Sequence, residues 1–153
     1  MLGEKNDPYD VIISGAGPAG LTAGIEAGRN HLSAIIFEKQ KNPGALPRGE
    51  TVHSAKIFTE ILGSDILNMI GTHFTAARKF HSPELKHEIE VYRHTPAIVF
   101  EWQEFMDLLI DRLEETPTKI KPNTKVVAPI FENNVCIGVK LENGEKHLFI
   151  EKN

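Results

Sequence analysis

The segment from residue 15 to residue 20 constrains the fold of this chain most strongly, because it reads Gly-Ala-Gly-Pro-Ala-Gly. It follows a short apolar run from Tyr9 to Ser14, whose β-branched, unalternating character is typical of a parallel strand covered on both faces. A helical stretch from Pro18 to Arg29 comes next, and proline suits the first turn of a helix. A second apolar run, Ser33 to Glu38, ends in a carboxylate. These residues predict a parallel strand, helix, strand unit.

The glycine turn and the carboxylate have separate physical roles. Gly15 permits the tight turn, Gly17 lets a pyrophosphate approach the backbone, and Gly20 lets the helix pack closely on the strand. The N-terminus of the helix presents free N–H groups and a partial positive charge to phosphates. Glu38 is placed to accept hydrogen bonds from a ribose diol, and it would repel a 2′-phosphate. The pattern predicts a dinucleotide site that disfavours NADP and leaves NAD and FAD open; a tight turn without a ligand is the alternative.

Small residues recur along one side of the first helix. Gly20, Gly24 and Gly28 stand every fourth residue, which places them on one face. Interior glycine costs roughly 1 kcal/mol relative to alanine, so this stripe needs a packing reason. We therefore expect the helix to approach the sheet closely.

The middle of the chain mixes elements. We expect a loop over residues 41–49, helices over 51–62 and 65–70, irregular strands between 74 and 100 with a turn at 81–83, and an amphipathic helix over 101–115. The apolar stripe of this last helix contains Phe105, Leu108, Leu109 and Leu113.

The end of the chain favours antiparallel strands. Three apolar runs cover residues 126–131, 135–141 and 146–150, and they are joined by Asn133-Asn134 and Asn143-Gly144. Asn-Gly is a strong hairpin pattern, because both residues tolerate the positive φ of a type I′ turn. We expect a three-stranded meander.

Composition excludes several classes of function. The 153 residues are 41% hydrophobic and 25% charged, which is ordinary for a soluble globular protein with one core. A net charge of −4 gives no basic field, so nucleic acid is not an expected partner. The apolar runs are too short to span a membrane, and the N-terminus has no signal-peptide pattern. We expect a cytoplasmic location.

Cysteine and histidine usage also argues against two kinds of site. The single Cys136 excludes an internal disulfide framework, and its apolar surroundings favour a small core residue. The seven histidines form no His-x-x-x-His pair, so no metal site is predicted. No residue can be named as catalytic from the sequence.

The run from Tyr9 to Ala23 resembles the start of flavoproteins of the glutathione-reductase type. Within that group, residues 46–51 (Leu-Pro-Arg-Gly-Glu-Thr) resemble the branch of geranylgeranyl reductases and para-hydroxybenzoate hydroxylase-like monooxygenases, which also includes flavin-dependent halogenases. The stretch from Asn123 to Gly144 resembles the meander that these proteins carry before their next FAD motif. The similarity covers roughly residues 8 to 148.

The resemblance implies FAD as cofactor and NAD(P)H as electron donor for the complete enzyme. Gly15, Gly17 and Gly20 would hold the pyrophosphate, with Ala16, Pro18 and Ala19 forming the same turn. Glu38 would bind the adenosine ribose with Lys39 close by, Arg48 would lie over the FAD, and the backbone at Val126 would meet the adenine. The implied fold class is α/β: a Rossmann-like βαβ unit, an inserted helical and irregular segment, and a C-terminal antiparallel meander.

In this interpretation residues 1–153 form a single domain that contains the βαβ unit (8–40), the insert (41–122) and the meander (123–150). The family often has glycine at the position of His31, and we expect Asn30 to take the left-handed conformation instead. The family also often has arginine at the position of Trp102, so a phosphate or ribose contact is either missing there or made by Gln103.

A third difference from the family, after those at His31 and Trp102, is that the chain ends at Asn153, before the Gly-Asp motif and the substrate domain. The expectation is therefore the truncated N-terminal FAD-binding part of a flavin-dependent reductase or monooxygenase that is inactive alone. Its substrate would be a small molecule or an isoprenoid, the latter implying peripheral membrane association. A catalytically inactive remnant and a small NAD-binding domain are the alternatives, and the oligomeric state is open.

Overall fold

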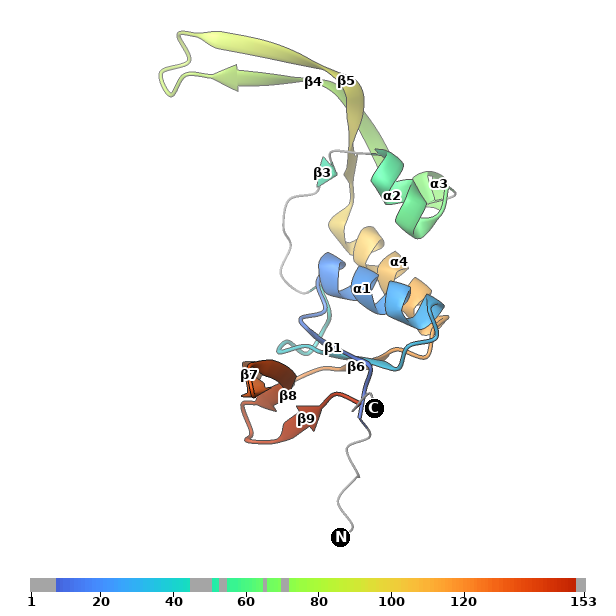
Figure 1. Ribbon diagram of the computed structural model, residues 1–153. Helices are drawn as coiled ribbons and strands as arrows, with labels where there is room; N and C mark the ends of the chain where they lie inside the picture. The colour runs from blue at the N-terminus through green and yellow to red at the C-terminus, as the bar shows by residue number, and fades with distance from the viewer. Residues whose placement is uncertain (1–7, 45–50, 53–54, 65, 70–71, 151–153) are drawn as a thin grey trace. The chain divides into compact units, whose positions relative to one another are not determined.

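The computed structural model describes residues 8–44, 51–52, 55–64, 66–69 and 72–150. The chain divides into two compact units, one formed by Met1–Leu46 with Met106–Asn153 and the other by Pro47–Phe105. The mixed α/β class expected from the sequence is confirmed (Figure 1). None of the helices in the described ranges is long and apolar enough to cross a membrane.

The first unit contains a parallel sheet with the strand order β1-β2-β6. Strand β1 (Val11–Ser14) leads into helix α1 (Pro18–Arg29), and β2 (Ala34–Phe37) follows, which confirms the predicted βαβ unit. The third strand, β6 (Lys119–Lys121), was not predicted. Its sequence is Lys-Ile-Lys with both lysines exposed, so it lacks the apolar run that marks β1 and β2.

The core of this unit lies between α1 and β2. All four residues of β2 are buried, and Leu21 and Ile25 of α1 are fully covered. A Cβ atom added to Gly24 would lie 2.8 Å from Ile36 Cδ1 and 2.9 Å from Leu113 Cδ1. The small residues of α1 therefore permit the close approach to the sheet that the sequence predicts, and they also admit Leu113 of helix α4 (Trp102–Glu114).

The C-terminal end of α1 corrects one prediction. His31 has a φ of 59°, whereas Asn30 has a φ of −90°, so the left-handed residue is the histidine. The His31 N–H donates to the Gly28 carbonyl at 3.0 Å, and the Leu32 N–H donates to the Ala27 carbonyl at 3.0 Å. This pair of bonds is the Schellman pattern, which requires positive φ one residue after the C-cap. The expectation for Asn30 was wrong because the bonds place it at the C-cap itself.

Helix α4 (Trp102–Glu114) carries the apolar stripe predicted for residues 101–115. Its buried side chains are Phe105, Met106, Leu108, Leu109 and Leu113. The predicted helix is therefore confirmed to within one residue at each end.

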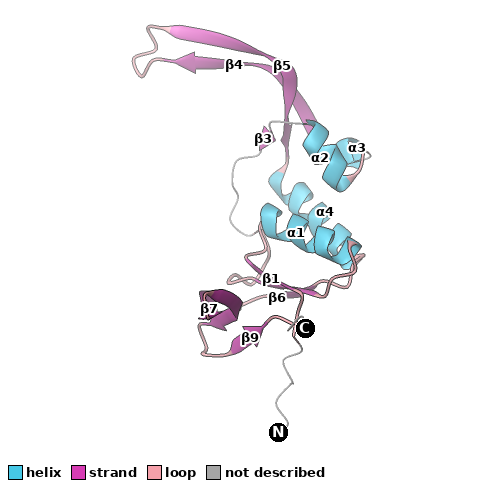
Figure 2. Cartoon of the chain, in the orientation of Figure 1, coloured by secondary structure: helices cyan, strands magenta, loops and turns pink. Residues whose placement is uncertain are grey.

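The second unit is built around an antiparallel sheet with the order β3-β5-β4 (Figure 2). In chain order its elements are β3 (Thr51–Val52), α2 (Ala55–Leu62), α3 (Ile66–Met69), β4 (Thr72–His81) and β5 (Glu88–Phe100). The helix predicted over 51–62 begins later, because residues 51 and 52 pair with Val99 and Ile98 of β5. The segment expected as irregular strands is a long hairpin with one register shift between Thr75 and Ala77.

The predicted meander is confirmed as β7 (Val126–Glu132), β8 (Val135–Leu141) and β9 (Lys146–Leu148). Asn133 and Asn134 both have positive φ, 48° and 63°, as a two-residue type I′ turn requires. The second turn differs from the expectation, because only Gly144 has positive φ. Its N–H donates to the Leu141 carbonyl at 3.0 Å, which makes a three-residue loop with a left-handed glycine.

Cys136 corrects a further prediction, since its side chain is exposed and not part of the core. It pairs with Phe131, which is also exposed, beside a register shift in β7. Only the opposite end of β8 packs into the core, through Leu141 and Val139. Apolar composition alone does not distinguish the covered end of such a strand from the open end.

Candidate adenosine and diphosphate site

The glycine turn joins β1 to α1 at the carboxyl ends of the parallel strands. The Gly15 N–H donates to the Phe37 carbonyl at 2.8 Å, which ties the turn to the end of β2. Gly15 has a φ of 101°, a conformation that side chains rarely adopt. A Cβ atom on Gly20 would overlap the Gly15 carbonyl oxygen, so only glycine fits where the helix crosses the turn.

The N-terminus of α1 is open to an anion. Its N-cap is Gly17, which makes no side-chain capping bond, and no acidic residue stands in the first turn. The first intrahelical bond runs from the Leu21 N–H to the Gly17 carbonyl at 2.9 Å. The N–H groups of Ala19 and Gly20 precede this bond, so helix geometry gives them no internal acceptor. A Cβ atom on Gly17 would meet nothing within 4 Å, which leaves room for a ligand against the backbone.

Glu38 is buried and firmly held beside the turn. It is only 7% exposed, and its Oε2 accepts the Ala16 N–H at 2.6 Å while Oε1 accepts the Gln40 N–H at 2.8 Å. Its backbone is fixed as well, because its N–H donates to the Lys121 carbonyl at 3.0 Å and its carbonyl accepts the Thr124 N–H at 2.7 Å. The carboxylate that the sequence assigns to the ribose is therefore bonded directly to the glycine turn.

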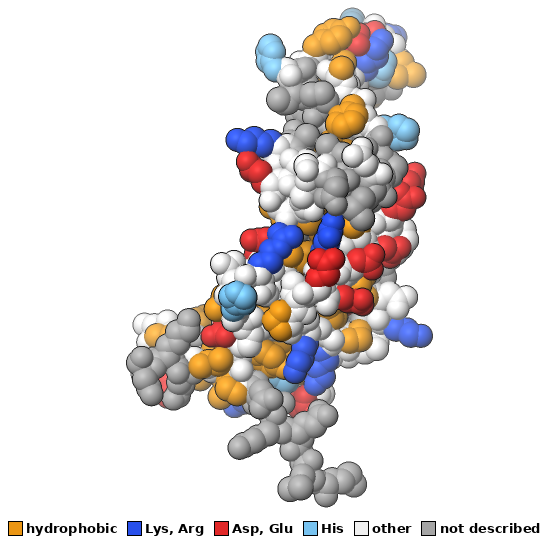
Figure 3. All heavy atoms as spheres, turned by 90° about the vertical axis from the view of Figure 1, so that its right-hand side faces the viewer, with side chains coloured by type: hydrophobic (Ala, Val, Ile, Leu, Met, Phe, Trp, Pro, Cys, Tyr) orange, Lys and Arg blue, Asp and Glu red, His pale blue; other side chains and the backbone are white. Residues whose placement is uncertain are grey.

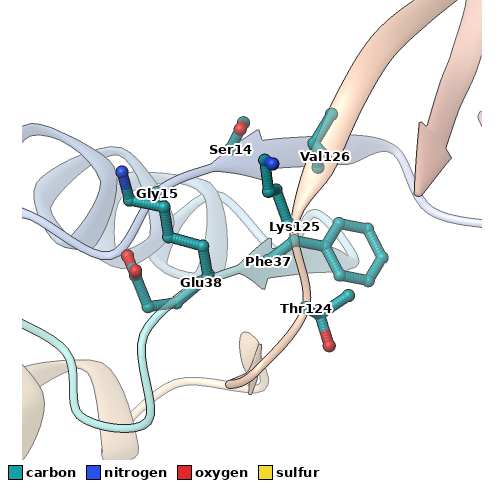
Figure 4. Close-up of a pocket in the computed structure, with 8 residues that line it drawn as sticks. Ser14, Gly15, Phe37, Glu38, Thr124, Lys125 and Val126 are labelled. Atoms are coloured by element: carbon teal, nitrogen blue, oxygen red, sulfur yellow. The ribbon is translucent and has the colours of Figure 1, made fainter. Parts of the chain in front are cut away.

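A cavity of about 260 Å³ opens next to Glu38 (Figure 4). Four of the residues named from the sequence lie around it, Gly15, Glu38, Lys39 and Val126. Ala16 joins them through its bond to Glu38. Gly17, Pro18, Ala19 and Gly20 continue the turn into α1, and Arg48 lies outside the described residues.

The remaining lining residues were not predicted: Ser14, Phe37, Thr124 and Lys125. Ser14 and Phe37 could have been found, because they lie at the carboxyl ends of the two parallel strands and ligands bind at that edge. Thr124 and Lys125 carry no motif of their own. They reach the cavity through the backbone bond between Thr124 and Glu38, which sequence spacing does not reveal.

Charge is mixed around the cavity. The Lys125 ammonium is 2.7 Å from Glu142 Oε1, in an exposed ion pair. A second cavity of about 250 Å³ lies beside this pair and shares Thr124 and Lys125 with the first. On the face drawn in Figure 3, basic and acidic side chains are interspersed. The described residues contain no group of three or more His, Cys, Asp or Glu side chains that could hold a metal ion.

Three comparisons with known proteins bear on this geometry. The family model described as "FAD binding domain" matches residues 8–136. A digeranylgeranylglycerophospholipid reductase of Haloferax volcanii is 27% identical over 146 residues, which are 95% of this chain and 34% of that protein. The chain thus spans about a third of the length of this relative.

Solved structures show the same fold. A geranylgeranyl bacteriochlorophyll reductase-like protein from Thermoplasma acidophilum matches with a TM-score of 0.73 at 22% identity, over 94% of this chain and 37% of that one. A flavin-dependent brominase matches with a TM-score of 0.71 at 23% identity, over 94% and 36% respectively. At this identity the structural matches support the fold alone, and the family match covers most of the chain, including the turn, Glu38 and Val126. The resemblance drawn from the sequence is confirmed, and the chain belongs to the FAD binding domain family.

Proposed function

We propose that this chain binds the ADP half of FAD at the cavity beside Glu38. Gly15 to Gly20 and the open N-terminus of α1 would hold the diphosphate, and Glu38 would accept the ribose hydroxyls. The backbone at Val126 would meet the adenine, with Lys39 near the ribose. One observation carries the proposal: the buried Glu38 carboxylate is bonded to Ala16, so the ribose acceptor and the diphosphate turn are held as one piece.

The residues present fit this ligand. A diphosphate needs backbone N–H donors and space, which the uncapped helix start and the open side of Gly17 supply. A ribose diol needs an acceptor, and each oxygen of Glu38 keeps acceptor capacity after its bond to a backbone N–H. A 2′-phosphate would lie against this carboxylate, so NADP is disfavoured at this site.

We further propose that the complete protein is a flavin-dependent oxidoreductase, either a reductase or a monooxygenase, with NAD(P)H as the electron donor. Bound FAD would supply the electron-transfer chemistry through its isoalloxazine. The substrate would be a small molecule or an isoprenoid, the latter suggested by the reductase relative. The lone Cys136 supports a cytoplasmic location, and an isoprenoid substrate would require work at a membrane surface.

Two alternatives share the same cavity. The ADP half is common to NAD and FAD, so an NAD-binding domain would use the same turn. A remnant that folds without catalysing would also keep it, and the chain spans about a third of the matched relative. We favour FAD because the family match extends past the cavity residues into the meander, as far as residue 136.

Calorimetric titration of the whole chain with FAD, ADP-ribose, NAD and NADP tests the proposal. We expect FAD and ADP-ribose to bind and NADP to bind weakest. Glu38→Gln should weaken FAD by about tenfold or more, since bonds to a charged acceptor contribute about 1.5–3 kcal/mol. Glu26→Gln, an exposed change on α1, is the matched control and should leave binding unchanged. Absence of FAD binding, or a preference for NAD or NADP, would overturn the proposal.

A further inference from the structure

His147 is a buried imidazole to which the sequence analysis assigned no role. It lies in β9 and is only 4% exposed. Neither ring nitrogen has a hydrogen-bond partner among the described residues. Glu145 Oε2 lies 3.9 Å from His147 Nε2, which is beyond hydrogen-bond length, so that contact is electrostatic only. A buried polar ring without hydrogen bonds is costly, and such groups are rare in folded proteins.

The ring of His147 rests against a residue of the cofactor cavity. It meets Phe37 edge-on, with the ring centroids 4.7 Å apart and the planes at 60°. The Phe37 ring points away from Glu38, toward the segment from Thr124 to Val126 (Figure 4). Phe37 is also one of the three buried residues of the cluster on which Val126 packs, and its carbonyl accepts the Gly15 N–H of the glycine turn. Phe37 is therefore tied to the turn through its backbone carbonyl, and it belongs to the cluster on which Val126 packs.

We propose that neutral His147 is a positioning residue for the cofactor. By packing against Phe37 it holds in place the Thr124–Val126 segment, which forms the rim of the cavity. FAD affinity then depends on the imidazole staying uncharged. This inference rests on the proposed function, because it assigns a control of affinity to the same cavity.

The surroundings disfavour the charged ring. Burial lowers the pKa of His147, the Lys121 ammonium lowers this pKa further, and Glu145 raises it by a smaller amount. Lys121 comes from β6 and Glu145 from the turn before β9, while β2 and β8 contribute the apolar Phe37 and Val139. A protonated ring would be drawn across the 3.9 Å gap toward Glu145 and away from Phe37. Because the pKa of His147 is lower in the folded chain than in the unfolded chain, the neutral ring contributes to the stability of the fold. That contribution is complete above the unfolded pKa and is lost as pH falls through the folded pKa.

The test measures FAD affinity of the whole chain by calorimetry between about pH 7.5 and about pH 4.5, a range that extends below the ordinary histidine pKa because that of His147 is lowered. A shift of one pKa unit on binding corresponds to a tenfold change in affinity, and we expect a fall of roughly three- to tenfold for the wild type. His147→Phe keeps an aromatic ring against Phe37 and cannot be protonated, so its affinity should stay flat across this pH range. His87→Phe makes the same change at an exposed turn residue and should keep the wild-type profile.

A parallel nuclear magnetic resonance titration of the free chain separates this inference from the proposed function. The backbone amides of Thr124, Lys125 and Val126 should shift with the His147 imidazole in the wild type and not in His147→Phe. Binding of FAD with the same pH profile in wild type and His147→Phe would overturn the inference and leave the proposed function intact. Absence of FAD binding at every pH would overturn the proposed function, and the amide shifts would then decide whether His147 controls the rim.

Discussion

The β1-α1-β2 region and the outer part of the β4–β5 hairpin differ in how far their apolar side chains are buried. Every residue of β2 is buried, and Ile36 is fully covered by α1 and its neighbours. On the hairpin, Phe80 and Ile89 face each other across the strands, yet they are 56% and 66% exposed. The first region is held by burial, whereas the outer part of the hairpin is held by its ladder of backbone hydrogen bonds. Burial returns at the inner end of β5, where Ala97, Ile98 and Phe100 are covered.

The charged side chains of the two regions also differ in burial. The hairpin ion pairs are exposed, as between Lys79 Nζ and Glu88 Oε1 at 3.3 Å, and such pairs contribute little to stability. In the first region the carboxylate of Glu38 is buried and bonded to backbone N–H groups. The candidate site at Glu38 therefore lies in the region whose side chains are fixed by packing. Matched substitutions in the two regions test this difference.

Truncation of isoleucine gives the largest expected contrast. Ile36→Ala removes a fully buried side chain and should cost about 4 kcal/mol of unfolding free energy, since buried isoleucine to alanine changes cost 2–5. Ile89→Ala removes an exposed side chain and should change it by less than about 0.5 kcal/mol. Urea unfolding of both variants measures the difference. Equal losses of unfolding free energy in the two variants would show that Ile89 is covered in solution, and the difference in burial between the two regions would then be wrong.

Alanine substitutions at two glycines of the turn distinguish a glycine needed for helix packing from one needed for FAD binding. Gly20→Ala forces a Cβ onto the Gly15 carbonyl oxygen, and such overpacking should cost about 3 kcal/mol of stability. Gly17→Ala meets nothing within 4 Å and has an ordinary φ of −81°, so its loss should stay below about 1 kcal/mol. We expect Gly17→Ala to weaken FAD binding in a folded chain. Normal FAD affinity in Gly17→Ala would place the diphosphate elsewhere.

The elements that could be predicted from sequence are those whose pattern is local. The β1-α1-β2 unit was predicted because the glycine turn, the helix and the two apolar runs lie within 30 residues, and the Glu38 side chain lies at the turn as its position after β2 requires. The meander was predicted from its turn residues for the same reason.

The features that were missed depend on partners distant in the sequence. Strand β6 is a strand only because the edge of β2 pairs with Ile120 and its neighbours. Thr124 lines the cavity beside its backbone bond to Glu38, and the buried His147 packs edge-on against Phe37. Neither residue belongs to a motif, so only the folded arrangement shows their part in the site.

A smaller effect is expected from two threonines that make the same bond in different surroundings. Thr118 Oγ1 donates to the Gly24 carbonyl at 2.8 Å in the buried interior, and Thr59 Oγ1 donates to the Lys56 carbonyl at 3.0 Å on an exposed helix. Thr118→Val removes a buried hydrogen bond to this carbonyl, which keeps its partner within the helix, and should cost about 1.5 kcal/mol. Thr59→Val leaves a carbonyl that water can reach, and it should cost less than about 0.5 kcal/mol. Thermal unfolding resolves the pair, and a larger loss for Thr59→Val would contradict the assignment of burial.

The smallest expected effect is a gain in stability at the end of α1. His31 holds a φ of 59°, where a side chain costs roughly 1 kcal/mol that glycine does not pay, so His31→Gly should raise the free energy of unfolding by about that amount. The neighbouring Asn30→Gly is the matched control: its φ of −90° gains nothing from glycine, and it loses the side-chain bond to the Glu26 carbonyl at 2.8 Å. It should therefore lower stability by about 0.5–1 kcal/mol. If urea unfolding instead shows Asn30→Gly to be the stabilising change, the left-handed residue is Asn30, as the sequence first suggested, and the Schellman arrangement at His31 is wrong.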